Sequence, residues 1–204
     1  MTPDEFAQLT SVSRETVERL KAYAALLIKW QARINLVGPA TIPDLWRRHM
    51  LDCAQLAPLL PGGPVLDLGA GAGFPGLVLA IVTGLPVHLA ESDGRKCAFL
   101  SEAIRVTGAS AQVHHRRIED LAPTAVAPLV VTARALAPLD RLLALAAPFL
   151  GRDSECLFLK GRGGEEELTQ ASKGWTMTIE RRASLADPSG LIIHLRGVHR
   201  GRNE

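Results

Sequence analysis

The chain is poor in cysteine, and its few cysteines are not arranged for disulfides or for a metal. Cys53, Cys97 and Cys156 are odd in number, lie far apart and form no Cys-x-x-Cys pair. Scattered cysteines of this kind are typical of reduced thiols in a cytosolic protein. The neighbouring His114 and His115 have no further ligand at metal-binding spacing. We therefore expect a cytoplasmic protein without a metal site.

Long hydrophobic runs are also missing. The longest apolar stretch, residues 77–90, is interrupted by Gly84 and Pro86 and is too short to cross a bilayer. The first ten residues are acidic and polar, unlike the apolar core of a signal peptide. These two absences argue against a membrane partner and against secretion.

Neither sign of charge dominates. Lys and Arg number 23 against 21 for Asp and Glu, which gives a formal net charge of +2. This mildly basic balance permits a nucleic-acid partner without requiring one. Hydrophobic residues make up 47% of the chain, and no repeat or low-complexity tract is visible, so a compact unit with a sizeable core is expected. No heptad pattern indicates self-association, and a monomer is the expectation.

Helical periodicity marks the first sixty residues. Apolar residues recur at spacings of three and four between Ser13 and Trp30. A second helical segment, residues 44–57, begins at a capping Asp44 and is followed by Pro58. The sequence therefore predicts an N-terminal helical region, residues 1–60, packed on the rest of the chain.

From Pro64 onward, short apolar runs alternate with helical segments. The expected strands are 65–68, 86–90, 111–115, 129–132 and 156–159, and the expected helices are 75–83, 95–107, 137–148 and 164–171. Such alternation is typical of βαβ units and of a mostly parallel sheet.

The last two expected strands, 176–182 and 191–196, are joined by a turn-forming cluster at residues 187–190 and indicate an antiparallel hairpin. The predicted fold class is therefore α/β. Residues 61–204 are expected to form a doubly wound, mostly parallel seven-stranded Rossmann-like sheet with an antiparallel C-terminal hairpin.

The strongest chemical signal is a glycine-rich stretch directly after the first expected strand, Asp67-Leu68-Gly69-Ala70-Gly71-Ala72-Gly73-Phe74-Pro75-Gly76. Glycines permit a tight turn and let a ligand approach the main chain without meeting a Cβ atom. Open α/β sheets bind ligands at the carboxyl ends of their strands. The loop is therefore predicted to bind a nucleoside-type cofactor.

Two kinds of cofactor compete for this loop. The glycines at 71, 73 and 76 also satisfy the dinucleotide fingerprint, which is weak evidence by itself. An aspartate at position 67 favours S-adenosylmethionine, because a carboxylate attracts its ammonium group and would repel a pyrophosphate. Glu91, after the second expected strand, is expected to accept hydrogen bonds from ribose hydroxyls in either case. Methyl-donor binding by Asp67, Gly69, Gly71, Gly73 and Glu91 is favoured; a dinucleotide site or a purely structural loop stays open.

The ends of later strands supply further candidates. Ile118 and Glu119 follow the third strand, where such folds hold an adenine ring. Arg134 follows the fourth, where an arginine can bind a carboxylate or a phosphate. Phe74, at the tip of the glycine loop, is a candidate contact to a base or to the cofactor. From the residues alone, core packing or a solvated surface position explains each of them at least as well.

The order of these elements resembles the bacterial small-subunit ribosomal RNA methyltransferase G family, also called glucose-inhibited division protein B. The resemblance is carried by Trp30 with Asn35-Leu36, Arg48-His49-Met50-Leu51-Asp52-Cys53, the loop 67–76, Glu91-Ser92 with Arg95-Lys96 and Phe99-Leu100, Arg117-x-Glu119, Arg134-Ala135 and Lys160-Gly161. Their combined order and spacing are specific, although each piece alone is not. Gln31, Val37 and Cys53 depart from the family's usual residues, all outside the glycine loop.

The resemblance implies methylation of guanine N7 in 16S ribosomal RNA, presented as RNA or as a small-subunit particle. It also implies that Gly69, Phe74, Ile118, Glu119 and Arg134 line an S-adenosylmethionine site. The basic residues considered for RNA contact are Arg48, His49, Arg117, Lys160 and Arg162. Two alternatives stay open: a small-molecule methyltransferase, and a ribosome-assembly factor that keeps the cofactor site without turnover.

No catalytic acid or base is expected for this reaction. The methyl group of a sulfonium donor is already activated and guanine N7 carries a free lone pair, so the chain has only to align them and exclude water. The sequence lacks the Pro-Cys pair used for covalent attack on cytosine and the Asn/Asp-Pro-Pro-aromatic motif of enzymes acting on exocyclic amines. A ring nitrogen or a small molecule is therefore favoured as the acceptor.

Overall fold

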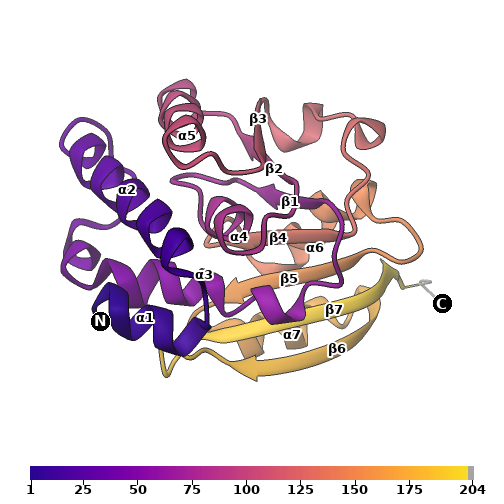
Figure 1. Cartoon of the computed structure of the whole chain (residues 1–204). Coiled ribbons are helices and arrows are strands. Elements are labelled where there is room, and N and C mark those ends of the chain that lie inside the picture. The colour runs from indigo at the N-terminus through magenta and orange to yellow at the C-terminus, as the bar shows by residue number, and fades with distance from the viewer. Residues whose placement is uncertain (202–204) are drawn as a thin grey trace.

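The computed structural model describes residues 1–201, and within them the chain is built on seven strands: β1 (Val65–Leu68), β2 (Val87–Glu91), β3 (Ala111–His115), β4 (Val130–Arg134), β5 (Glu155–Lys160), β6 (Trp175–Ala183) and β7 (Leu191–Arg200). They form one sheet in the order β3-β2-β1-β4-β5-β7-β6 (Figure 1). β1 to β5 are parallel, whereas β7 is antiparallel to both β5 and β6. The predicted doubly wound, mostly parallel seven-stranded sheet with an antiparallel C-terminal hairpin is confirmed.

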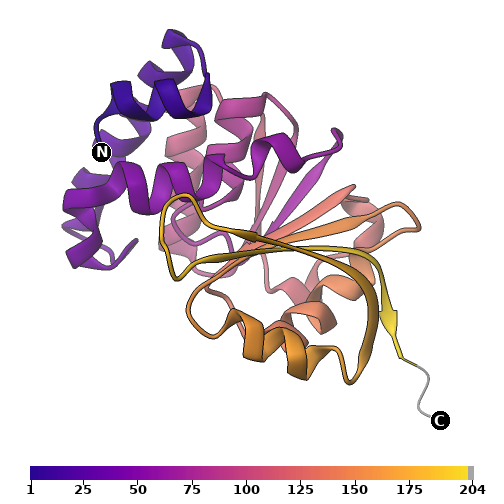
Figure 2. The same cartoon turned by 90° about the horizontal axis from the view of Figure 1, so that it is seen from below.

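Helices cover both faces of this sheet. The helices are α1 (Pro3–Thr10), α2 (Arg14–Gln31), α3 (Asp52–Ala54), α4 (Gly76–Thr83), α5 (Gly94–Thr107), α6 (Leu139–Ala146) and α7 (Gly164–Ala171). α4 and α5 lie on one face and α6 and α7 on the other, as the two views show together (Figures 1 and 2). The N-terminal helices pack outside α4 and α5, so the chain has a separate apolar core on each side of the sheet.

α2 links the N-terminal region to the sheet domain through its apolar stripe. Ser13 caps the helix, because its hydroxyl accepts a hydrogen bond from the Thr16 backbone N–H at 3.1 Å. The helix then buries one face against α4 and α5, through Val17, Leu20, Tyr23, Ala24 and Leu27. The predicted helix 13–30 is present, one residue longer at its end.

The segment expected to be one α-helix, residues 44–57, is not regular. It contains the end of a 3-10 helix (Pro39–Asp44), a π-helical turn (Trp46–Leu51) and the short α3. A π turn holds one residue more than an α turn and rotates the following side chains around the axis; such turns are frequent at functional sites. The prediction was wrong here because hydrophobic periodicity does not distinguish one extra residue per turn.

The alternation of side chains along two central strands decides which residues face the N-terminal helices. In β1 and β4, Leu66 and Val131 point to the α6–α7 core, whereas Asp67, Thr132 and Arg134 point to the opposite face. β1 pairs with β4 so that Asp67 lies beside Thr132. A polar row therefore runs along one face and ends at the carboxyl edge of the sheet.

The loop between β6 and β7 reaches back to the N-terminal region. The Gln55 amide donates to the Ser184 hydroxyl at 2.9 Å and accepts from the Leu185 backbone N–H at 2.7 Å. Ser184 in turn donates to the Asp52 carboxylate at 3.1 Å. The last hairpin is thereby joined to the irregular segment, residues 44–57 (Figure 2). Within residues 1–201, no helix is both long and apolar enough to cross a bilayer.

Candidate functional site

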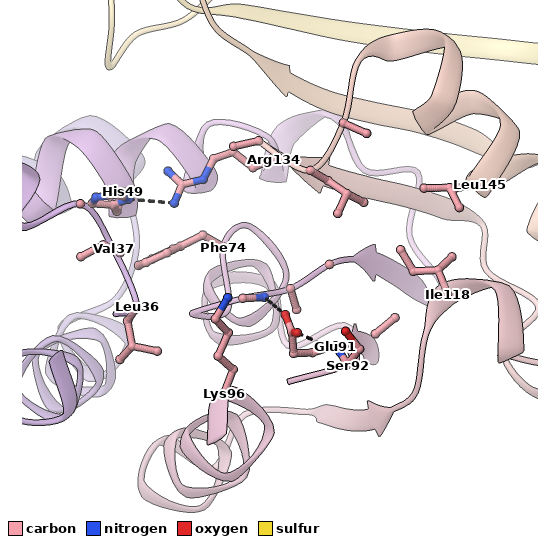
Figure 3. A pocket seen from close by; sticks show the side chains of 18 of the residues that line it. Leu36, Val37, His49, Phe74, Glu91, Ser92, Lys96, Ile118, Arg134 and Leu145 are labelled. Carbon is pink, nitrogen blue, oxygen red and sulfur yellow. Dashed lines mark hydrogen bonds between the residues drawn. The ribbon is translucent and has the colours of Figure 1, made fainter. Parts of the chain in front are cut away.

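A pocket of about 840 Å³ lies at the carboxyl ends of β1, β2 and β4 (Figure 3). The predicted cofactor residues that line it are Gly69, Gly71, Phe74, Glu91, Ile118, Glu119 and Arg134. The RNA-contact candidates Arg48, His49 and Arg117 line it too. The fold thus brings together ten side chains or backbone sites that are spread over almost ninety positions of the sequence.

The glycine loop forms the floor of the pocket. Gly69 and Gly71 have φ angles of +64° and +56°, which side chains rarely adopt. A Cβ atom at Gly71 would meet nothing closer than the Gly69 carbonyl oxygen at 3.8 Å, so it would project into open space above the loop. The loop therefore forms a cradle that is open at Gly71 because glycine has no side chain, and a ligand can approach the main chain there directly.

Glu91 is held firmly at the end of β2. One of its carboxylate oxygens accepts from the backbone N–H groups of Ser92 and Asp93, each at 2.8 Å. The other accepts from the Gly71 backbone N–H at 2.8 Å (Figure 3). A carboxylate offers about four lone-pair sites. Glu91 thus ties the glycine loop to β2 and keeps acceptor capacity for a ligand hydroxyl.

Asp67 does not line the pocket, and the expectation that its carboxylate meets a ligand ammonium is wrong in this structure. The side chain is fully buried below the loop. One oxygen accepts from the Gly76 backbone N–H at 2.9 Å and the other from the Thr132 hydroxyl at 3.0 Å. Burial raises the pKa of Asp67 to about 7 in spite of these two hydrogen bonds. Asp67 shapes the loop from beneath, because a strand-end side chain pointing to the α4 face meets the start of α4.

Gly73 is likewise placed beneath the pocket, not in its lining. A Cβ atom there would lie 2.8 Å from Leu77, 3.0 Å from the Tyr23 hydroxyl and 3.2 Å from Leu100. The glycine therefore permits close packing of the loop on α2 and α5, and its expected contact with the cofactor is replaced by this packing role. Tyr23, which lies in the apolar stripe of α2, supports the loop from below.

Phe74, His49 and Arg134 form one stacked cluster at the end of the pocket nearest the N-terminal region (Figure 3). The Phe74 and His49 rings are stacked with centroids 4.9 Å apart, and the Arg134 guanidinium lies 4.7 Å from the Phe74 ring centre. Arg134 donates to the His49 ring nitrogen Nδ1 at 2.8 Å. Phe74 is almost fully buried yet lines the pocket, so its ring can pack in the core and also contact a ligand.

The opposite end of the pocket is apolar. Ile118 follows β3 as expected, and Leu145 from α6 faces the same end (Figure 3). Ile118 packs against the core on the α6–α7 side, while Glu119 is exposed. The sequence did not indicate Leu145, because this residue follows Arg134 by eleven positions and only the fold brings α6 close to Ile118.

Comparisons with known proteins decide the family. A model of the family described as rRNA small subunit methyltransferase G matches residues 16–197. A ribosomal RNA small subunit methyltransferase G of Paramagnetospirillum magneticum is 60% identical, over 99% of this chain and 98% of the relative. The protein of the same name from Rhodospirillum rubrum is 56% identical, over 98% and 100%. The chain belongs to the rRNA small subunit methyltransferase G family.

The fold comparison agrees with this assignment. The solved structure of M. jannaschii TYW2 in complex with AdoMet matches with a TM-score of 0.57 over 83% of this chain and 80% of that one, at 16% identity. That identity is too low to carry residue roles. It supports a Rossmann-like methyltransferase fold for this member of the methyltransferase G family.

In this member of the methyltransferase G family, Lys160 and Arg162 lie outside the pocket. The Lys160 ammonium is paired with Glu167 at 2.7 Å and donates to the Ala137 carbonyl at 2.6 Å, and its side chain is only 7% exposed. This arrangement contradicts the expectation that Lys160 contacts RNA, because the side chain is buried and two of its three N–H donors are used in joining β5 to α7 and to the segment before α6. Arg162 is exposed in the β5–α7 turn, away from the pocket lining.

One wall of the pocket comes from the N-terminal region and was not predicted from the sequence. Leu36, Val37, Gly38 and Thr41 line the pocket from the connection after α2. The Gln31 amide holds this connection: its oxygen accepts from the Leu36 and Val37 N–H groups at 2.9 and 3.0 Å, and its nitrogen donates to the Val37 carbonyl at 2.9 Å. The Asn35-Leu36 element was the available signal, but nothing in the periodicity indicates that it faces a pocket.

The pocket of this family member is bordered by cations with no ion partner. Lys96, Arg116, Arg117 and Arg141 all line it, and none forms an ion pair within residues 1–201. Arg48 lines it as well but lies 4.0 Å from Asp187. A group of unpaired cations around one opening suits a polyanion such as an RNA backbone. Across the same residues, no group of three His, Cys, Asp or Glu side chains is placed to hold a metal ion.

Proposed function

We propose that this chain transfers a methyl group from S-adenosylmethionine to N7 of a guanine in 16S ribosomal RNA. The observation that carries the proposal is the match to the methyltransferase G family along residues 16–197, together with a pocket built from the matching elements. The M. jannaschii neighbour was solved with AdoMet, which supports the same donor here.

The donor subsite lies over the glycine loop. Gly71 leaves the main chain open to a ligand, whereas Gly69 makes room for the Leu136 side chain. Glu91 is fixed where it can accept from a ribose hydroxyl. Ile118 with Leu145 offers an apolar slot for an adenine ring. Arg134 stands at the other end, where its guanidinium can bind the amino-acid carboxylate. These roles fit a nucleoside that carries an amino acid.

The acceptor subsite is proposed on the side of residues 1–60. Leu36 and Val37 supply an apolar wall next to the Phe74 cluster, and a flipped base needs such a surface. Residues 61–204 then hold the donor, and the N-terminal helical region completes the pocket for the acceptor. Lys96, Arg117 and the neighbouring cations provide phosphate contacts at the rim.

The proposed reaction does not require a side chain that acts as an acid or a base. When bound, S-adenosylmethionine supplies a methyl group that its positive sulfur has already activated. Guanine N7 carries no proton, so the chain does not need to remove one. His49 is kept neutral at one end of the pocket and Asp67 is sealed below the loop, which leaves alignment and exclusion of water as the work of this chain.

We also propose that the protein acts as a monomer in the cytoplasm. Its three cysteines are free and buried, in keeping with a reducing compartment.

A transfer assay tests the proposal. The purified protein is incubated with methyl-labelled S-adenosylmethionine and with unmethylated small ribosomal subunits, naked 16S RNA or a metabolite pool, and the labelled nucleoside is identified by mass spectrometry. We expect 7-methylguanosine in RNA. Label only in metabolites would establish a small-molecule enzyme, and donor binding without any transfer would establish a non-catalytic factor; either result overturns the proposal. The control variant is Arg105→Gln, which should transfer the methyl group as the unmodified protein does, because Arg105 pairs with Glu102 on the outside of α5.

A further inference from the structure

Arg134 is held on three sides by protein groups. It donates from Nη2 to His49 Nδ1 at 2.8 Å and from Nη1 to the Arg48 carbonyl at 3.1 Å, and Nη1 also lies 3.4 Å from the Asp52 carboxylate. Its flat guanidinium covers the Phe74 ring. Of its five N–H groups, two have no partner in residues 1–201, which is the number a bidentate carboxylate requires.

The hydrogen bonds around His49 determine the position of its proton. An arginine can only donate, so the His49 Nδ1 atom that faces Arg134 must carry a lone pair. A neutral imidazole then has its proton on Nε2, which lies 2.7 Å from the Thr41 hydroxyl oxygen. Thr41 accepts that proton's hydrogen bond and donates its own to the Gly38 carbonyl at 2.7 Å. Every donor in this chain of contacts faces an acceptor.

The surroundings also oppose a charged His49. The ring is buried, and the cations that face it are Arg134 from β4 and Arg48 from its own segment. The Asp52 carboxylate is paired with Arg134 at 3.4 Å. Burial and these two cations lower the pKa of His49 to about 3. The imidazole therefore remains an acceptor toward Arg134 throughout the physiological range of pH.

We propose that His49 is a positioning residue: as a neutral acceptor fixed by Thr41, it orients the Arg134 guanidinium for the carboxylate of the methyl donor. This inference rests on the proposed function, since it takes the ligand of Arg134 to be the amino-acid end of S-adenosylmethionine. It also joins two walls of the pocket, because Gly38 and Thr41 belong to the proposed acceptor side while Arg134 belongs to the donor side. The contacts can be followed from His49 to Arg134 in Figure 3.

Two substitutions separate this role from simple packing. In His49→Asn, the side-chain oxygen can take the place of Nδ1 and accept from Arg134. In His49→Gln, the longer amide reaches the place of Nε2 next to Thr41 and leaves Arg134 without its acceptor. Both remove the stacked ring from Phe74 to the same degree, so a packing role predicts equal losses for the two variants.

The measurement is calorimetric titration of each variant with S-adenosylmethionine and with S-adenosylhomocysteine, in the absence of RNA. We expect His49→Gln to raise the dissociation constant roughly tenfold or more, and His49→Asn to remain within about threefold of the unmodified protein. In an Arg134→Ala background, His49→Gln should have almost no further effect, because its action passes through Arg134. Equal losses for Asn and Gln, or additive losses with Arg134→Ala, would overturn the proposal.

A second readout uses the unmodified protein, so it does not depend on variants that fold. Long-range proton–nitrogen spectra of histidine-labelled protein should show His49 with an unprotonated Nδ1 and a protonated Nε2, unchanged on lowering the pH to about 5. A protonated Nδ1 would overturn the proposal. Failure of the unmodified protein to bind either donor analogue would instead overturn the proposed function, so the two failures are distinguishable.

Discussion

The Tyr23 hydroxyl donates a hydrogen bond to the carbonyl oxygen of Ala72, and this contact joins helix α2 to the glycine loop. Tyr23 is fully buried and Ala72 nearly so. The same hydroxyl lies under Gly73, where no side chain could fit. The shape of the loop that forms the pocket floor therefore depends on a residue 46 positions before its first glycine, in a region that contributes no strand to the sheet.

Removing this hydroxyl is expected to loosen the loop. Tyr23→Phe keeps the ring against Phe74 and Phe99 but leaves the Ala72 carbonyl without its donor in a buried position. We expect a loss of about 1–3 kcal/mol in the free energy of unfolding and weaker donor binding. Urea denaturation and calorimetric titration measure the two effects. An unchanged affinity of Tyr23→Phe for S-adenosylmethionine would show that the loop keeps its shape without this hydrogen bond from α2.

A methyl group on the loop is expected to block the pocket floor. Gly71→Ala places its Cβ in the space above the loop. It also forces alanine to adopt a φ of +56°, which lowers the stability of the fold by on the order of 1 kcal/mol. We predict at least tenfold weaker binding of S-adenosylmethionine, with the fold kept, as judged by circular dichroism. Gly84→Ala is the matched control, because Gly84 also has a positive φ of 73° and open space but lies at the end of α4 outside the pocket. Equal effects of the two changes on donor binding would contradict the cradle.

Asp67 should give the protein a specific dependence on pH. Its pKa is about 7 in the folded chain against 3.8 ordinarily, because burial disfavours the charge. Between these two values the folded state keeps a proton that the unfolded chain has released. The contribution of Asp67 to stability is therefore largest below about pH 4 and is lost as the pH rises through about 7.

Asp67→Asn tests this dependence. The amide can still accept from the Gly76 N–H and can donate to the Thr132 oxygen, so the loop keeps its anchor. Urea midpoints measured from about pH 5 to about pH 8 should show the variant losing less stability than the unmodified protein as the pH rises. Parallel curves for the two proteins would rule out a proton on Asp67 in this range.

Lys160 and Arg117 should respond differently to loss of their charge. Lys160→Met breaks a largely buried pair with Glu167 and is expected to cost about 2 kcal/mol of stability without changing the salt dependence of RNA binding. Arg117→Gln removes an exposed, unpaired cation at the pocket and should reduce the slope of log affinity against log salt by about one. Binding to small subunits over a series of salt concentrations gives both slopes. A lower slope for Lys160→Met alone would reverse the assignment.

The local pattern of residues was sufficient for most of the fold. Short strand-like runs alternating with helical stripes predict β1 to β5 and α4 to α7. The central strands β1, β4 and β5 are buried on both faces, and such parallel strands are mainly apolar in sequence. The π turn at Trp46–Leu51 escaped prediction, since one extra residue in a turn leaves no trace in an amphipathic pattern. That turn carries His49, so the error falls at the candidate site.

Within the site, the sequence by itself determined which residues could matter, and the tertiary structure decided what each one does. Glycines at 69 and 71, an acid at the end of β2 and an arginine at the end of β4 follow from strand ends and from the absence of Cβ atoms. Whether Asp67 points into the pocket or beneath it, whether Lys160 is free or paired, and which way the proton of His49 lies could not be read from the order of residues. Those outcomes depend on the neighbours that distant segments bring within about 3 Å, and burial by those neighbours sets both the hydrogen-bond partners and the charge.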